Sequence, residues 1–235
     1  MEQDLGQLLD IAVRPAGAAP LRMPQALALG GHGLDGDRHA DPVSPRQLLL
    51  AGAPAYAGLG LPALALRENL LLEADTVSFR SGEVLRIGAT FTLRLMFQCE
   101  ACGGLDRHQP GLSRAIGGRR GMLARVLAGG RIQPGDRVAG LGPLLPAWPE
   151  DWRERVRIVL DALPPGHVLG YRQLAHLAGV AASYCRAFPR AIARLGPDYA
   201  GGAVPASAPP RLPRWPGDGL FADELRAGLR DAAGP

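Results

Sequence analysis

The chain has 235 residues, which is enough for one large domain or two small ones, each with its own core. No apolar run reaches the ~18 residues of a membrane-spanning helix, and the first residues lack the pattern of a signal peptide. Three cysteines, two of them close together, do not make the disulfide framework of a secreted domain. The composition therefore predicts a cytoplasmic protein without a membrane segment.

The basic side chains are all arginines, and the formal net charge is +4. Any anion site must therefore be built from permanently charged guanidinium groups. Residues 107–135 contain six arginines and no carboxylate, and residues 162–197 contain four arginines and no carboxylate. Each stretch could be an ordinary solvated face, but together they favour two anion-binding surfaces.

The first part of the chain predicts short strands. Apolar runs separated by Gly, Asp and Pro lie at residues 46–52, 69–74, 84–88 and 90–97, and the last of these alternates clearly. This pattern is typical of a mostly β domain. We expect that domain to span residues 1–140.

Residues 141–149 contain three prolines and are expected to form a linker. Beyond them, apolar residues recur at helical spacing and predict a small helical domain over residues 150–235. The expected elements are a helix at residues 152–163, an extended piece with a second helix at residues 167–179, a third helix at residues 182–195 and a closing helix at residues 221–233. Pro189 would lie in the first turn of the third helix or just before it.

Cys99 and Cys102 are spaced C-x-x-C, which allows three interpretations. A structural zinc site would need a second pair of ligands, and no such pair with suitable spacing occurs in the sequence. A thioredoxin-like redox pair would need a βαβ context that is not predicted. The third interpretation, which we favour, is a single working thiol with a neighbouring bystander.

Residues 5–140 resemble the molybdenum-cofactor sulfurase C-terminal (MOSC) domain. The resemblance depends on the sequence GLDGDRH at residues 33–39, on Arg67, Glu68 and Asn69, and on the closing pattern RG…GG-x-I-x-x-GD at residues 120–136. It implies a β-barrel-like fold. Some family members bind the molybdenum cofactor through a thiolate, and others are thought to carry sulfur or to reduce N-hydroxylated compounds, including base analogues.

The resemblance also implies which residues form the site. The functional cysteine of the family is followed by two residues and a leucine, which here gives Cys102 and leaves Cys99 as an extra. Cys102 would be the catalytic residue and the metal ligand, or the acceptor of sulfur. A thiolate suits both roles, and nearby arginines would favour the ionised form. The cofactor pocket would contain Arg38, His39, Arg67, Asn69 and Arg120. The open alternative is that His39 only caps a tight turn that needs Gly36.

Residues 150–195 resemble the DNA-binding domain of O6-alkylguanine-DNA alkyltransferases and alkyltransferase-like proteins, a small winged-helix-like domain. The matching residues are Pro165, Gly166, Val168, Tyr171, Leu174, Ala175, Gly179, Arg186 and Ala187. The resemblance implies that Tyr171 pushes on the backbone of a target nucleotide and that Arg186 fills the vacated stack. Tyr171 could instead be a packed aromatic residue at the start of a helix.

Arg186, Arg190 and Arg194 follow one another at intervals of four residues. In one continuous helix they would share a face and could contact phosphates. An ordinary solvated face is the open alternative.

The acceptor motif of the alkyltransferases, Pro-Cys-His-Arg, is lost. Its nearest counterpart is residues 204–208, with Ala206 at the position of the acceptor cysteine. Cys185 is displaced from that position and is expected to pack within a helix. We therefore predict that the chain is not an active alkyltransferase.

Together these patterns predict an α+β protein, in which a β-barrel-like MOSC domain precedes a small winged-helix-like domain. One hypothesis is an oxidoreductase or sulfur transferase that uses molybdenum cofactor (molybdopterin) or a persulfide at Cys102. Its partners would be DNA or a modified nucleobase and a redox partner protein. The other hypothesis is a non-enzymatic DNA lesion sensor in which the MOSC half is a scaffold or partner surface.

Overall fold

The computed structural model describes residues 2–209, 211–222 and 224. These residues form two compact units. Unit 1 holds the described residues of 1–42 and 46–148 together with Glu224, and unit 2 holds those of 43–45 and 149–222. The helix expected over residues 221–233 falls for most of its length outside the described residues.

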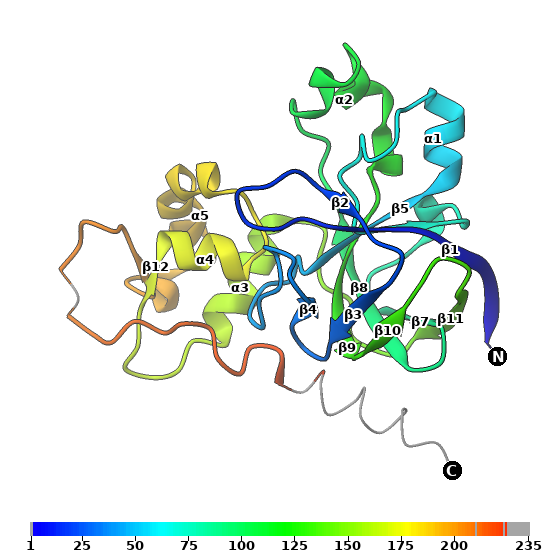
Figure 1. The fold of residues 1–235 in the computed structure, drawn as a ribbon. Coiled ribbons are helices and arrows are strands. Elements are labelled where there is room, and N and C mark those ends of the chain that lie inside the picture. The colour runs from blue at the N-terminus through cyan, green and yellow to red at the C-terminus, as the bar shows by residue number, and fades with distance from the viewer. Residues whose placement is uncertain (1, 210, 223, 225–235) are drawn as a thin grey trace. The chain divides into compact units, whose positions relative to one another are not determined.

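Unit 1 is built around a closed barrel of seven strands. The strand order is β11-β7-β8-β9-β5-β6-β1, and β1 also pairs with β11, which closes the barrel (Figure 1). The pairs are antiparallel except for β5 and β6. The strands are β1 (Gln3–Val13), β5 (Leu48–Gly52), β6 (Leu70–Leu72), β7 (Glu83–Ile87), β8 (Phe91–Gln98), β9 (Met122–Ala128) and β11 (Arg137–Pro143). The barrel-like fold expected for the first domain is confirmed.

The inside of the barrel is filled by alternate residues of its strands, as the period of two requires. On β8, Phe91, Leu93 and Leu95 belong to the main core cluster and have no exposed surface. The intervening residues of this strand include Arg94, which is also buried. Truncation of Phe91 to alanine is expected to cost about 3–5 kcal/mol, as for other large buried side chains.

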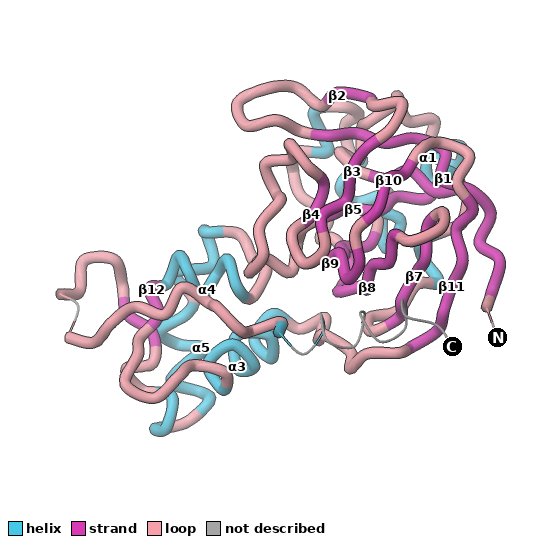
Figure 2. The backbone as a smooth tube through the Cα atoms, turned by 60° about the horizontal axis from the view of Figure 1, so that its bottom comes forward, coloured by secondary structure: helices cyan, strands magenta, loops and turns pink. Residues whose placement is uncertain are grey.

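Smaller elements complete unit 1. A three-stranded sheet runs β10-β3-β4, and a short strand extends the barrel sheet beyond β1 (Figure 2). These elements are β2 (Leu21–Arg22), β3 (Ala26–Leu29), β4 (Gly33–Leu34) and β10 (Gly130–Ile132), with the helices α1 (Ala53–Leu59) and α2 (Leu112–Ala115) and the 3-10 turns η1 (Thr76–Ser78), η2 (Leu105–Arg107) and η3 (Gly117–Arg120).

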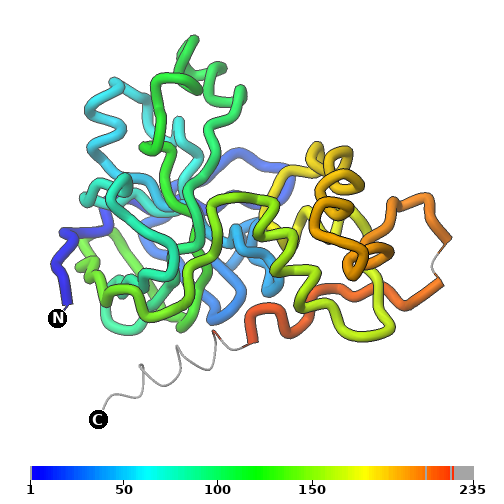
Figure 3. The backbone as a smooth tube through the Cα atoms, turned by 180° about the vertical axis from the view of Figure 1, so that it is seen from behind, coloured from blue at the N-terminus to red at the C-terminus, as the bar shows by residue number. Residues whose placement is uncertain are grey.

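A long excursion, residues 99–121, leaves the barrel between β8 and β9 and contains α2. It stands out from the barrel in the front and back views (green in Figures 1 and 3). Its apolar side chains pack against those of α1 and the following loop in a separate small core. That core consists of Ala51, Ala55, Leu66, Leu105, Leu112 and Ile116.

Unit 2 is mainly helical. Its elements are α3 (Trp152–Asp161), β12 (Leu169–Gly170), α4 (Tyr171–Leu177), η4 (Ala182–Arg186), α5 (Phe188–Leu195), η5 (Pro197–Tyr199) and β13 (Ala203–Val204). Helix α3 begins at Asp151, whose side chain accepts a hydrogen bond from the backbone nitrogen of Arg153. Strands β12 and β13 are parallel, and residue 168 forms a further parallel bridge with residue 214. A winged-helix fold stays a prediction.

The expected third helix over residues 182–195 is broken, which corrects one sequence-based inference. Arg186 ends the 3-10 turn η4, whereas Arg190 and Arg194 lie on α5. Pro189 occupies the first turn of α5, because proline is tolerated there and not in the interior of a helix. The three arginines therefore do not form one stripe on a single helix.

The proline-rich segment after the barrel begins within a strand. Strand β11 continues to Pro143, which pairs with Glu83, so residues 141–143 of the expected linker belong to the sheet. Among the described residues, no helix combines the length and apolar character needed to cross a membrane.

Candidate anion-binding site

The sequence GLDGDRH folds into a tight turn that buries one carboxylate. Gly36 has a φ of 75°, a left-handed conformation that glycine adopts without strain. The turn brings Asp37 inward, where it accepts hydrogen bonds from the backbone nitrogens of Arg14 (2.9 Å) and His39 (2.8 Å) and from the His39 ring Nδ1 (2.9 Å). These contacts agree with one of the two alternatives for these residues, in which Gly36 allows the turn and His39 caps it.

These hydrogen bonds determine the ionisation of Asp37. Burial alone would raise its pKa, but hydrogen bonds from His39 and Arg14 and the charge of Arg14 outweigh burial and lower the pKa to about 2. Asp37 is therefore a carboxylate at neutral pH. It provides the buried negative charge of this region.

Asn69 is the hydrogen-bonding centre of the region. It is fully buried, and its Nδ2 donates to Asp37 Oδ2 (2.7 Å) and to the backbone oxygen of Ala12 (3.1 Å). Its Oδ1 accepts from Leu49 N (3.1 Å) and from Arg14 Nη2 (2.5 Å). Because both amide donors are already used within the protein, Asn69 can position its neighbours but has no donor left for a bound molecule.

Arg14, at the end of β1, is a member of this site that the sequence did not single out. It is 7% exposed, and its Nε lies 3.8 Å from Asp37 Oδ2 without a hydrogen-bond partner. Burial is the main cause that lowers its pKa; Asp37 opposes this, and the positive charges of Arg38, Arg67 and Arg120 add to it. Each of these three guanidinium groups therefore lies close enough to Arg14 for their like charges to act on it.

We call Arg14, Arg38, Arg67 and Arg120 the arginine cluster. The structure thus brings together three of the predicted cofactor-binding residues. Arg38 and Arg67 are exposed, whereas Arg120 is 6% exposed, donates from Nη1 to the backbone oxygen of Leu66, and keeps a buried Nε without a partner. Within the described residues, the ion pair of Arg14 with Asp37 is the cluster's one close pair with a carboxylate.

A second carboxyl group, that of Glu68, lies near the cluster. Glu68 is 2% exposed, and its Oε2 accepts a hydrogen bond of 2.6 Å from the hydroxyl of Tyr56. Burial raises the pKa of Glu68, although the Tyr56 hydrogen bond and the charges of Arg120 and Arg14 pull it down. Burial also raises the pKa of Tyr56. Glu68 is therefore held by Tyr56, and within the described residues it forms no ion pair with the cluster.

Arg67 holds an uncommon backbone conformation. Its φ is 56°, and the nearby Leu64 has a φ of 63°. Left-handed conformations cost non-glycine residues roughly 1 kcal/mol, and such strain gathers at functional sites. The turn that contains Arg67 connects directly to Asn69, so it links an exposed guanidinium to the buried hydrogen-bond centre.

Cys102 lies on the excursion that also carries Arg120. The excursion closes at its base, where the backbone nitrogen of Cys99 donates to the oxygen of Gly121 (2.8 Å). Cys102 is three residues beyond this closure, a reach of at most about 11 Å, and Arg120 directly precedes Gly121. The thiol of Cys102 is exposed, whereas Cys99 is 7% exposed and buried.

The two cysteines thus occupy different environments, which bears on the alternatives for C-x-x-C. In the described part of the chain no group of three or more His, Cys, Asp or Glu side chains could hold a metal ion. Cys102 would therefore be a lone protein ligand to any metal, with other ligands supplied by the cofactor itself. The exposed thiol is also the one that a sulfur donor could reach.

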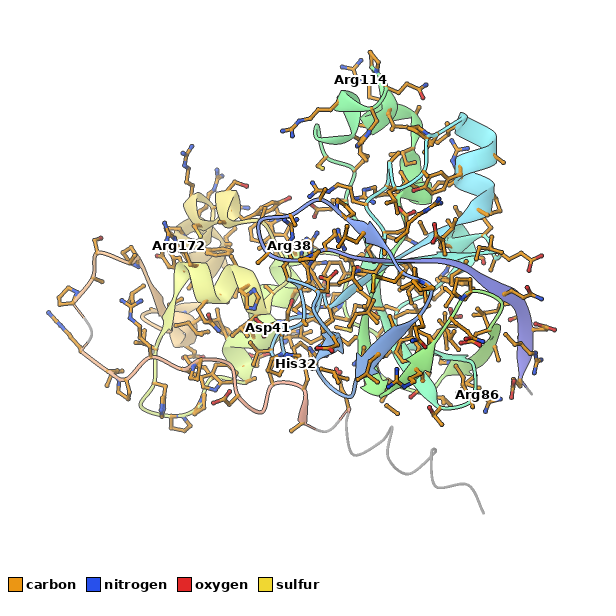
Figure 4. The ribbon with its side chains drawn as sticks, in the orientation of Figure 1. His32, Arg38, Asp41, Arg86, Arg114 and Arg172 are labelled. Atoms are coloured by element: carbon orange, nitrogen blue, oxygen red, sulfur yellow. The ribbon has the colours of Figure 1, made fainter. Side chains whose placement is uncertain are left out.

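The arginines of residues 107–135 do not form one anion-binding surface, which corrects the expectation for that stretch. Arg114 lies at the outer end of the excursion, far from Arg38 beside the barrel (Figure 4). Arg119 donates to the backbone oxygen of Ala115 (2.8 Å). Arg125 is 1% exposed and forms an ion pair with Glu224 (3.2 Å).

Glu224 is shared between two buried arginines. Its Oε1 pairs with Arg94 and its Oε2 with Arg125. Arg94 also donates to the backbone oxygen of Pro146, and Arg125 to that of Pro42 (3.0 Å). This pair of guanidiniums is therefore neutralised partly by a carboxylate and bonded further to the backbone.

In unit 2, the predicted DNA-binding residues lie on three consecutive helical elements. Tyr171 begins α4 and packs edge-on against the buried Phe188, with 5.8 Å between ring centroids. Burial raises the pKa of Tyr171. Arg186, Arg190 and Arg194 are exposed. One side of Tyr171 is thus packed, which agrees with the alternative of a packed aromatic residue at the start of a helix. Part of its side chain stays accessible.

The comparisons with known proteins bear on the barrel. The family model of the MOSC domain matches residues 49–139. The structure is similar to the YUAD protein from Bacillus subtilis, with a TM-score of 0.52, 14% identity and coverage of 60% of this chain and 97% of that one. A structure described as a hypothetical protein has a TM-score of 0.52 and 17% identity, with coverage of 82% of this chain and 92% of that one. YiiM from Geobacillus stearothermophilus has a TM-score of 0.47 and 15% identity, with coverage of 81% of this chain and 99% of that one. No curated protein matches.

At these identities the two structures with a TM-score of 0.52 show a shared fold and nothing more. The second covers a larger share of this chain than unit 1 holds, so the likeness extends into unit 2. The comparisons contain no support for the alkyltransferase-like resemblance. Of the two sequence resemblances, the first is supported over part of its expected range: residues 49–139, which contain Arg67, Asn69, Cys102 and Arg120, match the MOSC domain.

Proposed function

We propose that unit 1 binds the molybdenum cofactor, with the arginine cluster holding the anionic end of the pterin and Cys102 providing the thiolate. One observation carries this proposal. Arg120 keeps a buried Nε without a partner, in a cluster of four guanidiniums that has one close ion pair among the described residues. A buried donor without a partner costs about 1–3 kcal/mol, so a phosphate oxygen that accepted from it would recover that loss.

The residues fit the two ends of such a cofactor. Planar guanidinium forks suit phosphate oxygens, and a thiolate suits a soft metal centre. When bound, the cofactor would supply a metal centre that exchanges electrons with a substrate such as an N-hydroxylated or damaged base. Asn69 and Asp37 would position the residues that contact the cofactor, because they hold Arg14 and the turn that carries Arg38 and His39.

Elemental and cofactor analysis of the purified protein tests this proposal. Wild-type protein should contain molybdenum and a pterin that oxidises to a fluorescent product, and both should be lost in Cys102→Ala and in Arg120→Gln. Cys185→Ala and Arg131→Gln are matched controls, since they remove a thiol and an exposed guanidinium outside the cluster, and they should keep both. Wild-type protein without molybdenum or pterin after expression in a cofactor-producing host would contradict the proposal.

A sulfur carrier is the other chemistry that Cys102 supports, because its thiol is exposed. Intact-mass measurement after incubation with a sulfur donor separates the two. A gain of one sulfur atom that is removed by reductant and absent in Cys102→Ala would indicate a persulfide carrier. Unchanged mass with bound molybdenum would favour the oxidoreductase.

For unit 2 we propose a role in DNA binding without dealkylation. The supporting observation is that Arg186, Arg190 and Arg194 are exposed and have no ion pair among the described residues, so their charges are available to phosphates. Tyr171 borders a pocket next to Ala206, where the sequence resemblance implied the lost acceptor cysteine. In this proposal the chain is a cytoplasmic protein that brings a cysteine-dependent MOSC domain to DNA or a modified nucleobase, with a redox partner as electron donor.

Fluorescence anisotropy with labelled duplexes, with and without O6-alkylguanine, tests the DNA-binding proposal. Binding should weaken with rising salt and should fall in Tyr171→Ala and Arg186→Ala. A preference for the alkylated duplex, in protein that contains no molybdenum and gains no sulfur, would favour the lesion sensor in which unit 1 is a scaffold. Absent or salt-independent binding would exclude the role in DNA recognition and leave unit 2 as a packing domain.

A further inference from the structure

Unit 2 contains a pocket of about 340 Å³, the one bordered by Tyr171 and Ala206, to which the DNA-binding proposal assigns no free ligand. This volume lies at the lower end of the roughly 300–1,000 Å³ of small-molecule sites. Two aromatic side chains and two arginines line it, together with a small side chain and the backbone at the end of β12. These residues are Tyr171, Trp215, Arg172, Arg214, Ala206 and Gly170.

The aromatic part of the pocket is held rigidly. Trp215 is 5% exposed, its backbone nitrogen donates to Val168 O (3.0 Å), and its Nε1 donates to Asp218 O (3.1 Å). Tyr171 is fixed on its other side by the edge-on contact with Phe188. Rings that are held in place lose little entropy when a flat molecule packs against them.

Arg214 is fixed at its backbone but has most of its donors free. The parallel bridge of Arg214 with Val168 anchors the main chain. Its guanidinium lies against the backbone of Gly170, since a Cβ at position 170 would come within 2.6 Å of Arg214 Nη1. The one side-chain hydrogen bond that Arg214 makes with a described residue is a long contact of 3.5 Å from Nη2 to Ala208 O.

The charge of the pocket is positive. Arg172, on α4 (Figure 4), and Arg214 both line it, and no carboxylate does. Neither arginine has an ion pair with a carboxylate of the described residues. A guanidinium beside a fixed ring favours a flat ligand that carries negative charge, because stacking and charge-assisted hydrogen bonds can then act together.

We propose that this pocket binds a free nucleoside 5′-monophosphate, with the base against Trp215 and Tyr171 and the phosphate bound by Arg172 and Arg214. The assignment is independent of the cofactor site in unit 1. It also differs from contact with a DNA strand, because the pocket is small enough for one nucleotide and the bound phosphate is a terminal dianion.

Isothermal titration of the full chain with GMP and AMP tests the proposal, with guanosine, adenosine and inorganic phosphate as the partial ligands. The mononucleotides should bind, and each partial ligand should bind at least about tenfold more weakly, since ring and phosphate both contribute. Arg214→Gln should weaken binding by about tenfold or more. Arg211→Gln, which removes an exposed guanidinium outside the pocket, should leave it unchanged.

Ala206→Leu gives a second test that does not alter charge. Residue 206 lies on an exposed loop at the pocket, so a larger side chain should fill the cavity without disturbing the core. Binding of the mononucleotides should then be lost while the thermal transition stays in place. Equal affinity in wild type, Arg214→Gln and Ala206→Leu would overturn the proposal, and so would binding of DNA oligonucleotides that depends on Arg214 without any binding of mononucleotides.

Discussion

Unit 1 contains two groups of arginines that differ in how their charge is compensated, and each group includes two buried guanidiniums. Arg94 and Arg125 share the carboxylate of Glu224 and donate to backbone oxygens as well. The arginine cluster has Asp37 as its close carboxylate, and Asp37 also accepts hydrogen bonds from His39 and Asn69. Each group keeps buried Nε atoms without partners, namely that of Arg94 and those of Arg14 and Arg120. An unpartnered Nε therefore does not by itself mark a site; the proposal for the arginine cluster depends on its combination with a shortage of close carboxylates.

Under the proposed function, this difference would separate arginines that stabilise the fold from arginines that bind an anion. A buried guanidinium that is paired inside the chain contributes to the fold, and removal of its partner is costly. A set of guanidiniums with excess positive charge is costly until an anion joins it. The following variants would sharpen or break that distinction.

The largest effect is expected for Glu224→Gln. The substitution leaves two buried guanidiniums without their carboxylate, and the loss of one partner from a buried ion pair costs about 3–5 kcal/mol of unfolding free energy. Urea unfolding followed by tryptophan fluorescence measures it. Glu2→Gln is the control, because Glu2 pairs with the partly exposed Arg86 and the exposed Arg137, and its substitution should cost no more than about 1 kcal/mol. Similar losses in both variants would mean that Glu224 is an ordinary surface partner.

A smaller effect is expected from Asp37 as a function of pH. Its folded pKa of about 2 lies below the usual 3.8, so the stability it contributes is present above about pH 4 and is lost as the pH falls towards 2. The difference corresponds to about 2 kcal/mol. Asp37→Asn should flatten the unfolding free energy over this range, whereas Asp35→Asn, in the same turn, should keep the wild-type slope. A slope unchanged by Asp37→Asn would show that other carboxyl groups cause the acid sensitivity.

A stabilisation of about 1 kcal/mol is expected when phosphate is added to wild-type protein, because a ligand of the folded state raises its stability by mass action. The melting temperature in phosphate should exceed that in chloride at equal ionic strength by a few degrees, or about 2–4 °C per kcal/mol. Arg120→Gln should abolish the difference, and Arg131→Gln should preserve it. If Arg94→Gln abolished it as well, the contrast between the two groups would fail.

The smallest effect on stability is expected for Cys102→Ser, within about 0.5 kcal/mol, because the side chain is exposed. Its chemical reactivity should nevertheless stand out. Iodoacetamide should label Cys102 well before the buried Cys99, as peptide mass spectrometry can resolve. Equal labelling of both cysteines would indicate that the base of the excursion opens in solution.

Much of the barrel could be predicted from the sequence, because strands leave a local signal. The apolar runs at residues 46–52, 69–74, 84–88 and 90–97 contain β5, β6, most of β7 and most of β8. The long strand β1 was missed because its exposed and buried residues do not alternate regularly. With it, Arg14 was missed, since an arginine at the end of an unrecognised strand carries no sign of what it will face.

The sequence located three arginines of the cluster but did not show how hydrogen bonds connect this region. The motifs located Arg38, Arg67 and Arg120, which the structure brings together around Arg14. They also suggested Asn69 as a contact to the cofactor, yet its amide donors are used by Asp37 and Ala12. Hydrogen bonds that join residues 12, 37, 49 and 69 depend on tertiary structure, so no spacing rule could reveal them. In the same way, the four-residue spacing predicted that Arg186 lies on one helix with Arg190 and Arg194. Spacing alone does not show that the helix is interrupted before Pro189.

The closure of the excursion has an evolutionary consequence. Gly121 fits against β5 so closely that a Cβ there would lie 2.2 Å from Leu50 O, and its backbone is tied to Cys99. The exposed residues between these two points can therefore change in length or composition while the paired strands keep their register. The barrel can therefore act as a constant frame that tolerates exposed segments of different length between β8 and β9.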